Sequence, residues 1–152
     1  MRAIFKAYDR LTAAAGGRAV ESLTLLFVRI ALAGIFWRSA RTKVEEGSWL
    51  SISDTTYFLF QEEYAGLPLP TDLSVPLATY AEHLFPILLV VGLFTRFSAL
   101  ALLVMTMVIQ IFVYPDAWWS VHMIWVALAL VLIVRGGGAL SLDALLLKMR
   151  GK

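Results

Sequence analysis

Residues 97–114 read FSALALLVMTMVIQIFVY, a run of eighteen residues with no formal charge and a single amide, Gln110. A helix that crosses the hydrocarbon core of a bilayer needs about 20 predominantly apolar residues. The run is long and does not alternate between polar and apolar residues, which favours a helix over a strand. Because backbone groups in lipid must be hydrogen-bonded internally, we interpret this run as a transmembrane helix.

Three further stretches approach the same length, at 22–39, 76–94 and 117–134. We therefore expect an all-α integral membrane four-helix bundle that forms one domain over residues 1–152. The composition agrees, since 60% of the residues are hydrophobic and 16% are charged, whereas soluble domains average about 45–50% and about 25%. The absence of cysteine excludes disulfides, thiolate metal sites and iron–sulfur clusters.

The basic residues lie at the ends of the apolar runs rather than in one patch. We therefore expect the lipid bilayer, and not nucleic acid, to be the partner of this chain. An even number of spans places one set of them on a single side: Arg2, Lys6, Arg10, Arg18, Arg96, Arg135, Lys148, Arg150 and Lys152. The opposite side carries most of the acids: Glu45, Glu46, Asp54, Glu62, Glu63, Asp72 and Asp116. The positive-inside rule then predicts that both termini are cytoplasmic.

Shorter helices are expected around the spans. Residues 2–14 and 142–149 have the amphipathic pattern of helices that lie in the membrane interface, and Ser141 is a suitable N-cap for the second of them. The long outer loop, 44–75, contains a further predicted helix over 55–64, capped by Ser53 or Asp54.

Polar side chains from all four spans fall in the outer third of the predicted bundle. Glu82 lies six residues after Pro76, or about 9 Å along a helix that rises about 1.5 Å per residue. Charged residues at such a depth face the bundle interior, are paired, and are candidates for function. We predict one ligand or proton pocket from five of these residues: Arg38, Glu82, His83, Gln110 and His122.

Two interpretations of this cluster are open. Glu82 could form a purely structural ion pair with Arg38 or Arg41. Alternatively, Arg38 and the histidines could bind a carbonyl oxygen of a non-covalently held quinone, while Glu82 accepts or relays a proton.

A third interpretation is a metal site, since two histidines and a carboxylate suit a divalent ion. Its donors would be His83 and His122 with Asp116 or Glu82. Adjacent residues on a helix point about 100° apart, so Glu82 and His83 cannot easily share one ion, and our expectation is that no metal is bound.

Arg29 lies deeper, about 10 Å from the inner end of its span at about 1.5 Å per residue. We expect it to be a structural charge that reaches inner headgroups or free backbone carbonyls. Arg41 and Lys43, at the outer end of the same span, are predicted to be structural charges as well.

The first span contains Arg29 and Ala33-Gly34-Ile35-Phe36 and is followed by Lys43, and in the second Glu82 precedes Gly92-Leu93-Phe94-Thr95-Arg96. Together these segments resemble the DoxX family of small bacterial four-helix membrane proteins. The runs 36–44, 110–118 and 141–143 are similar to a subgroup encoded beside multinuclear iron oxidases. The resemblance implies a multi-pass protein of the bacterial inner (plasma) membrane.

DoxX-like proteins are linked to membrane oxidoreductase complexes, including the small subunit of thiosulfate:quinone oxidoreductase and an oxidative-stress complex in mycobacteria. The resemblance thus implies an accessory subunit of a quinone-linked redox system, with a partner protein in the membrane or periplasm. Two alternatives stay open: a component for handling or transporting metal or other ions, and a structural anchor for a partner enzyme.

Overall fold

The computed structural model describes residues 1–151, apart from the side chains of Arg2, Ala3, Ala7, Arg10, Leu11 and Ala14. Lys152, which belongs to the predicted cytoplasmic set of basic residues, lies outside the described residues, as do the side chains of Arg2 and Arg10. The chain is helical in the order α1 (Arg2–Ala15), α2 (Arg18–Thr42), α3 (Asp54–Glu62), α4 (Thr71–Val91), α5 (Thr95–Phe112), η1 (Pro115–Ala117), η2 (Trp118–His122), α6 (Met123–Arg135) and α7 (Leu142–Arg150).

Four segments are long and apolar enough to cross a membrane: α2, α4, α5, and the stretch from Pro115 to Arg135. This confirms the predicted all-helical four-span fold. Large apolar side chains on each of these segments are exposed, among them Phe27 on α2, Leu77 on α4, Val104 on α5 and Ile124 on α6. Such exposed apolar faces suit a lipid environment, because exposing large apolar patches to water is energetically unfavourable.

The span boundaries differ from the predictions at several helix ends; α2, for example, runs from Arg18 to Thr42 rather than over 22–39. α4 begins at Thr71 rather than at Pro76 and continues through both Pro76 and Pro86. The last span does not begin as an α-helix. A 3₁₀ turn at Pro115–Ala117 leads into one π-helical turn, η2, in which the Met123 N–H donates to the Trp118 carbonyl five residues earlier. π-Helical turns within helices occur frequently at functional sites, and this one ends at His122.

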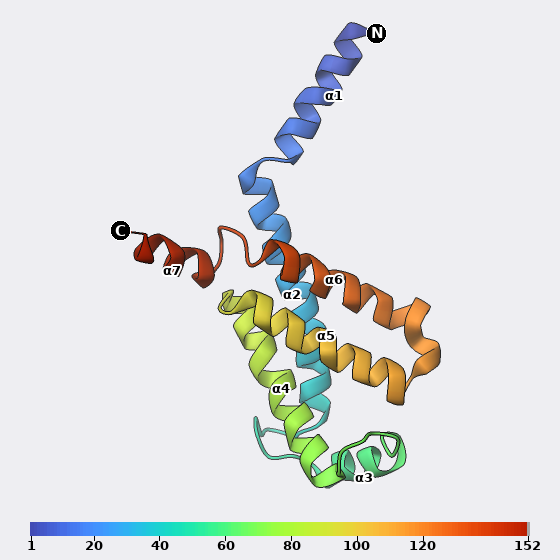
Figure 1. Ribbon diagram of the computed structural model, residues 1–152. Helices are drawn as coiled ribbons and strands as arrows, with labels where there is room; N and C mark the ends of the chain where they lie inside the picture. Colours follow the sequence, from blue (N-terminus) through green and yellow to red (C-terminus); the bar gives the residue numbers. More distant parts are fainter. Residues whose placement is uncertain (152) are drawn as a thin grey trace.

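The bundle consists of two helix pairs. α2 packs most extensively against α4, and α5 against α6 (Figure 1). Alanines, leucines and one phenylalanine form the core between them: Leu25, Leu32, Ala33, Phe36, Leu89, Ala99, Leu102, Ala129 and Leu132. The Phe36 and Trp125 rings join α2 to α6 edge to face, with centroids 5.6 Å apart.

The turn between α4 and α5 lies at the same end of the bundle as both terminal helices (Figure 1). Gly92 is left-handed (φ 72°) and ends α4, with Leu93 N–H bonded to the Leu88 carbonyl. Phe94 is also left-handed (φ 49°), and its N–H and that of Thr95 donate to the Asp143 carboxylate. α7 is thereby attached to the bundle by its first turn.

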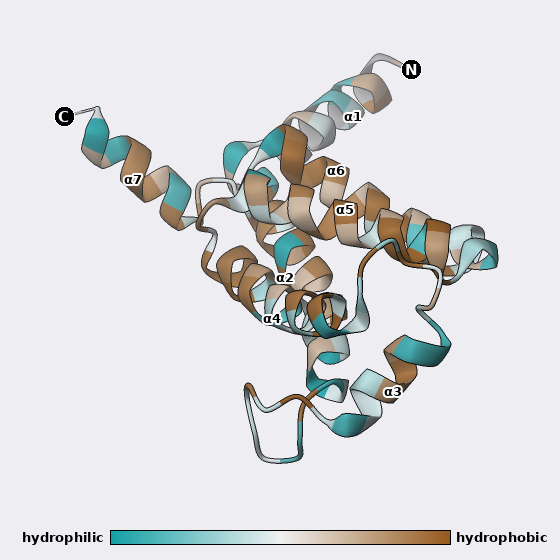
Figure 2. Cartoon of the chain, turned by 60° about the horizontal axis from the view of Figure 1, so that its bottom comes forward, coloured by the Kyte–Doolittle hydropathy of each residue, from teal (hydrophilic) through white to brown (hydrophobic). Residues whose placement is uncertain are grey.

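The predicted caps and short helices are present. Ser141 Oγ accepts from Ala144 N–H at the start of α7, and Ser53 Oγ accepts from Thr56 N–H at the start of α3. α3 lies at the opposite end from the termini, beside the start of α4 (Figures 1 and 2). Figure 2 also shows that hydrophobic residues dominate α4, α5 and α6, whereas α3 and α7 carry both hydrophobic and hydrophilic residues.

Candidate functional site

A buried ion pair joins α2 to α4. Lys43 Nζ lies 2.7 Å from Glu82 Oε2, and the two side chains are 8% and 2% exposed. Lys43 also donates to Ser39 Oγ at 2.8 Å, one helical turn earlier on α2. A buried carboxylate needs a cationic partner and hydrogen bonds, and Lys43 supplies both here.

The backbone of Lys43 also fixes α3. Its carbonyl accepts from Thr56 Oγ1 at 2.9 Å and from Ser53 N–H at 3.1 Å. Lys43 is therefore the residue at which α2, α3 and α4 meet.

The expected pairing of Glu82 with Arg38 or Arg41 is corrected, since the cation beside the carboxylate is Lys43. Arg38 is exposed. Arg41 donates to the Ser48 carbonyl at 2.7 Å and stacks over the Trp49 ring. Arg38, Arg41 and Lys43 lie within six residues of one another at the end of α2. The helix register decides which of them pairs with Glu82: one turn is about 3.6 residues, so Lys43 shares a helix face with Ser39.

A second polar pair comes from the other half of the bundle. His122 Nδ1 lies 2.7 Å from Gln110 Oε1, and the Gln110 amide donates to the Pro115 carbonyl at 2.6 Å. Since that carbonyl can only accept, the amide oxygen faces His122, and His122 Nδ1 carries the hydrogen. The other ring nitrogen, Nε2, is then the free acceptor of the neutral imidazole.

Glu82 and His122 line the same cavity, which has a volume of about 270 Å³. Its other polar walls are Ser39, Tyr64 and Tyr114, and its apolar walls include Phe36 and Trp125. Burial is the main reason that the pKa of Tyr64 is raised, so its phenol stays protonated at neutral pH and remains a donor. The cavity wall thus combines a carboxylate, an imidazole, two phenols and the Ser39 hydroxyl.

A larger apolar groove adjoins this cavity between α4 and α5. Its volume is about 530 Å³, and its walls are mostly aliphatic and aromatic, with Leu77 and Val104 among them. Tyr64, Glu82 and Ile109 line both spaces. Phe60, stacked on Tyr64 at 4.2 Å, places α3 over the end of the groove.

The remaining candidate residues do not join this cavity. His83 Nδ1 donates to the Thr79 carbonyl, 2.7 Å away, and its ring lies edge-on to Trp37. Asp116 is exposed. Within residues 1–151, no group of three or more histidine or acidic side chains could hold a metal ion.

Comparison with known proteins identifies the family. The DoxX family profile matches residues 24–115, from α2 to the start of η1. The chain belongs to the DoxX family. It is also 33% identical, over 85% of its own length and 87% of the relative's, to an uncharacterized protein of Haemophilus influenzae. No solved structure matches the chain significantly.

Arg29 of this DoxX protein is fully buried and bonded to backbone carbonyls. Its guanidinium donates to Leu89 and Val90 at 3.1 and 3.3 Å, near the free C-terminal end of α4, and to Leu140 before α7. The carbonyls at a helix end lack intrahelical partners. Arg29 thus bonds to backbone carbonyls at the end of the bundle opposite α3, and its role as a structural charge stays a prediction.

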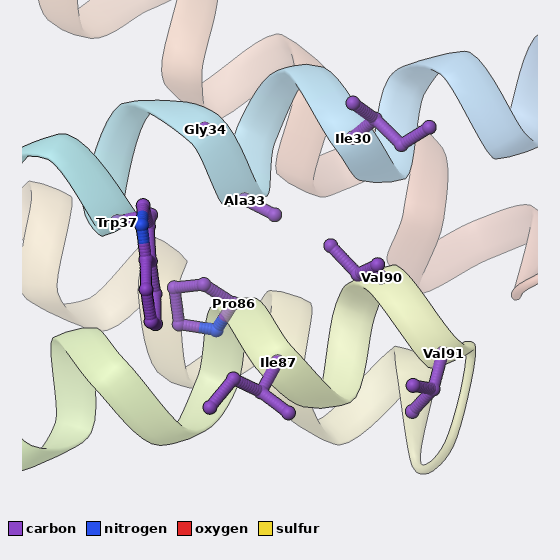
Figure 3. Close-up of a pocket in the computed structure, with 8 residues that line it drawn as sticks. All are labelled: Ile30, Ala33, Gly34, Trp37, Pro86, Ile87, Val90 and Val91. Carbon is purple, nitrogen blue, oxygen red and sulfur yellow. The ribbon is translucent and has the colours of Figure 1, made fainter.

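A second apolar groove, of about 330 Å³, is lined by residues of both α2 and α4. Figure 3 shows Trp37 and Pro86 at one end of it and Ile30 and Val90 farther along. Trp37 also covers His83, which separates that histidine from the groove.

Sequence reasoning missed three polar walls of the cavity in this DoxX protein: Ser39, Tyr64 and Tyr114. The spacing of Ser39 and Lys43 on one helix face was a usable signal for the first. Tyr64 lies outside the predicted spans and Tyr114 is the last residue of one of them, and both line the cavity once α3 packs against α4.

Proposed function

We propose that this DoxX protein is an accessory subunit of a quinone-linked membrane oxidoreductase and holds a quinone head group non-covalently between Glu82 and His122. The observation that carries the proposal is the meeting of a polar cavity with an apolar groove at Tyr64, Glu82 and Ile109. A quinone has the same two parts, a polar ring and an apolar tail. Small-molecule sites typically measure roughly 300–1,000 Å³, and the cavity and groove together fall within that range.

The residues present suit the polar ring. The protonated Tyr64 phenol can donate to a carbonyl oxygen of the quinone, and His122 Nε2 can accept a hydrogen bond. A bound quinone supplies two-electron, two-proton redox chemistry. The chain would orient the ring, exclude water, and hold or pass protons at Glu82 Oε2 and His122 Nε2. Since it lacks cysteine, electrons would come from a partner protein.

The same proposal places the protein in the bacterial inner membrane with both termini in the cytoplasm. The basic residues at the terminal end and the acids near α3 support this orientation. It also assigns the chain to the subgroup encoded beside multinuclear iron oxidases, on the resemblance of residues 36–44, 110–118 and 141–143.

Trp125 offers a direct test, because its ring centroid lies 5.1 Å from that of His122. A short-chain benzoquinone titrated into the purified full-length protein should quench tryptophan fluorescence saturably. Trp125→Phe should remove most of the saturable component, and Trp119→Phe, at a 77% exposed position, should leave it intact. Quenching that never saturates, or that is equally reduced in both variants, would contradict the proposal.

A structural anchor for a partner enzyme is the second candidate. The observation that favours it is that Lys43 fixes α2, α3 and α4 together through atoms of the protein alone. If the protein is only an anchor, benzoquinone should cause no saturable quenching of tryptophan fluorescence in the wild-type protein. Glu82→Gln would then lower the amount of folded protein and of captured partner in equal proportion.

A further inference from the structure

A further cavity, of about 590 Å³, lies at the end of the bundle that carries the termini, remote from the proposed quinone site. It is bounded by the start of α5, by the end of α6 with its glycine loop, and by α7, which Figure 1 shows extending away from the bundle. Three arginines line it: Arg96, Arg135 and Arg150. Apolar side chains form the rest of its wall, including Phe97 and Leu147, both more than half exposed.

The charges in this wall do not cancel. Arg135 is paired with Glu21, so its charge is compensated from α2. Both Asp143 oxygens accept backbone N–H groups, from Phe94 at 2.8 Å and Thr95 at 2.9 Å. Arg96 uses one of its five donors on the Ile133 carbonyl at 3.0 Å. Arg96 and Arg150 against Asp143 leave an excess of one positive charge.

A buried hydroxyl without a partner points to a ligand here. Thr95 is fully buried and lines the cavity, and its Oγ1 has no hydrogen-bond partner within the described part of the chain. A buried polar group without a partner is costly. The space beside it is kept open by glycine, because a Cβ on Gly137 would lie 2.7 Å from Thr95 Oγ1. A Cβ on Gly136 would approach Arg96 Nε to 3.3 Å.

We infer that this cavity binds the phosphate of an anionic phospholipid, with Arg96 and Arg150 as its cationic partners and the Thr95 hydroxyl as a further donor. Guanidinium groups pair well with phosphate oxygens. The apolar wall at Phe97 and Leu147 suits the adjoining acyl chains, since it continues the lipid-facing surface of α5. A lipid with one net negative charge matches the single excess positive charge, whereas a zwitterionic lipid does not.

Native mass spectrometry of the full-length protein, offered equal amounts of phosphatidylglycerol and phosphatidylcholine, tests this inference. Phosphatidylglycerol should be retained in excess. Each of Arg96→Gln and Arg150→Gln should lower that excess by about fivefold, the effect of about 1 kcal/mol for one basic residue near an anionic surface. Lys148→Gln is the matched control, because it removes the same charge from α7 without touching the cavity, and it should leave the excess unchanged.

Competition with inorganic phosphate distinguishes a phospholipid headgroup from a free phosphate ion as the bound anion. Phosphatidylglycerol that stays bound in millimolar inorganic phosphate supports a lipid site, and displacement by inorganic phosphate overturns it in favour of a free anion. Equal retention of the two lipids by the wild-type protein also overturns the inference, and so does an equal loss in Arg150→Gln and Lys148→Gln. Arg150 lies on the exposed end of α7, so its replacement should leave the bundle folded.

Discussion

Lys43 Nζ lies 2.7 Å from Glu82 Oε2, with both side chains less than a tenth exposed. The pair joins the end of one span to the middle of the next, and the Lys43 carbonyl binds α3. A single contact thus sets both the stability of this end of the bundle and the position of the carboxylate in the cavity.

Removal of one partner of this pair should be costly. Lys43→Met leaves a buried carboxylate alone, and loss of one partner of a buried pair typically costs about 3–5 kcal/mol. The double variant Lys43→Met/Glu82→Met should cost less than either single variant, because no unpaired charge remains. Thermal unfolding in detergent, followed by circular dichroism, measures all three. Additive losses would contradict a direct coupling of the two residues.

Arg29 should hold the terminal end of the bundle together. Arg29→Met leaves the Leu89, Val90 and Leu140 carbonyls without this donor. Hydrogen bonds to a charged group contribute about 1.5–3 kcal/mol each, so we expect a loss of more than about 3 kcal/mol. Amide hydrogen exchange should also become faster in residues 139–150. Arg18→Met, at an exposed position, is the control; an equal effect there would contradict this role.

Two glycines should respond in opposite ways to alanine. Gly92 is left-handed, and a Cβ there would lie 2.6 Å from Ser141 Cβ and 2.1 Å from Arg29 Nη1. Gly92→Ala should therefore destabilise by more than about 1–2 kcal/mol, the conformational cost alone. Gly34, on the α2–α4 groove of Figure 3, meets nothing within 4 Å, so Gly34→Ala should stabilise by about 0.5–1 kcal/mol. Equal thermal midpoints for the two variants would refute this contrast.

The contact between Tyr114 and Glu63 should depend on pH. The Tyr114 hydroxyl donates to the Glu63 carboxylate, and this bond raises the tyrosine pKa above its usual value of about 10. The contact therefore stabilises the folded state fully below that usual pKa, and its contribution is lost as the pH rises through the raised pKa. Ultraviolet titration should show one tyrosine whose pKa falls in Glu63→Gln. A titration curve unchanged by that substitution would show that the bond does not control the pKa.

The four spans were predictable because hydrocarbon imposes a length and a polarity that the sequence displays directly. The caps at Ser53 and Ser141 were predictable for a similar reason, since their hydrogen bonds join residues three positions apart. The late start expected for α4 shows the limit of this reasoning: Thr71 to Val75 continue the helix past the end of the apolar run.

The partner of Glu82 could not be selected from sequence alone. Arg38, Arg41 and Lys43 lie at similar depths, and the selection depends on helix register and on the folding of α3 beneath the carboxylate. His83 illustrates the same limit, because its neighbour Glu82 lines the cavity while its own ring faces Trp37. His122 and Gln110 met as expected, since the short connection between their spans restricts them to one end of the bundle.

Photolabelling with an azido-benzoquinone, followed by peptide mapping, tests the quinone proposal most directly. We expect the label on residues 109–114 and 121–125, the two segments that wall the cavity opposite Glu82, and we expect an excess of unlabelled quinone to prevent it. A label spread over the lipid-facing surface, or one that unlabelled quinone does not reduce, would contradict the account.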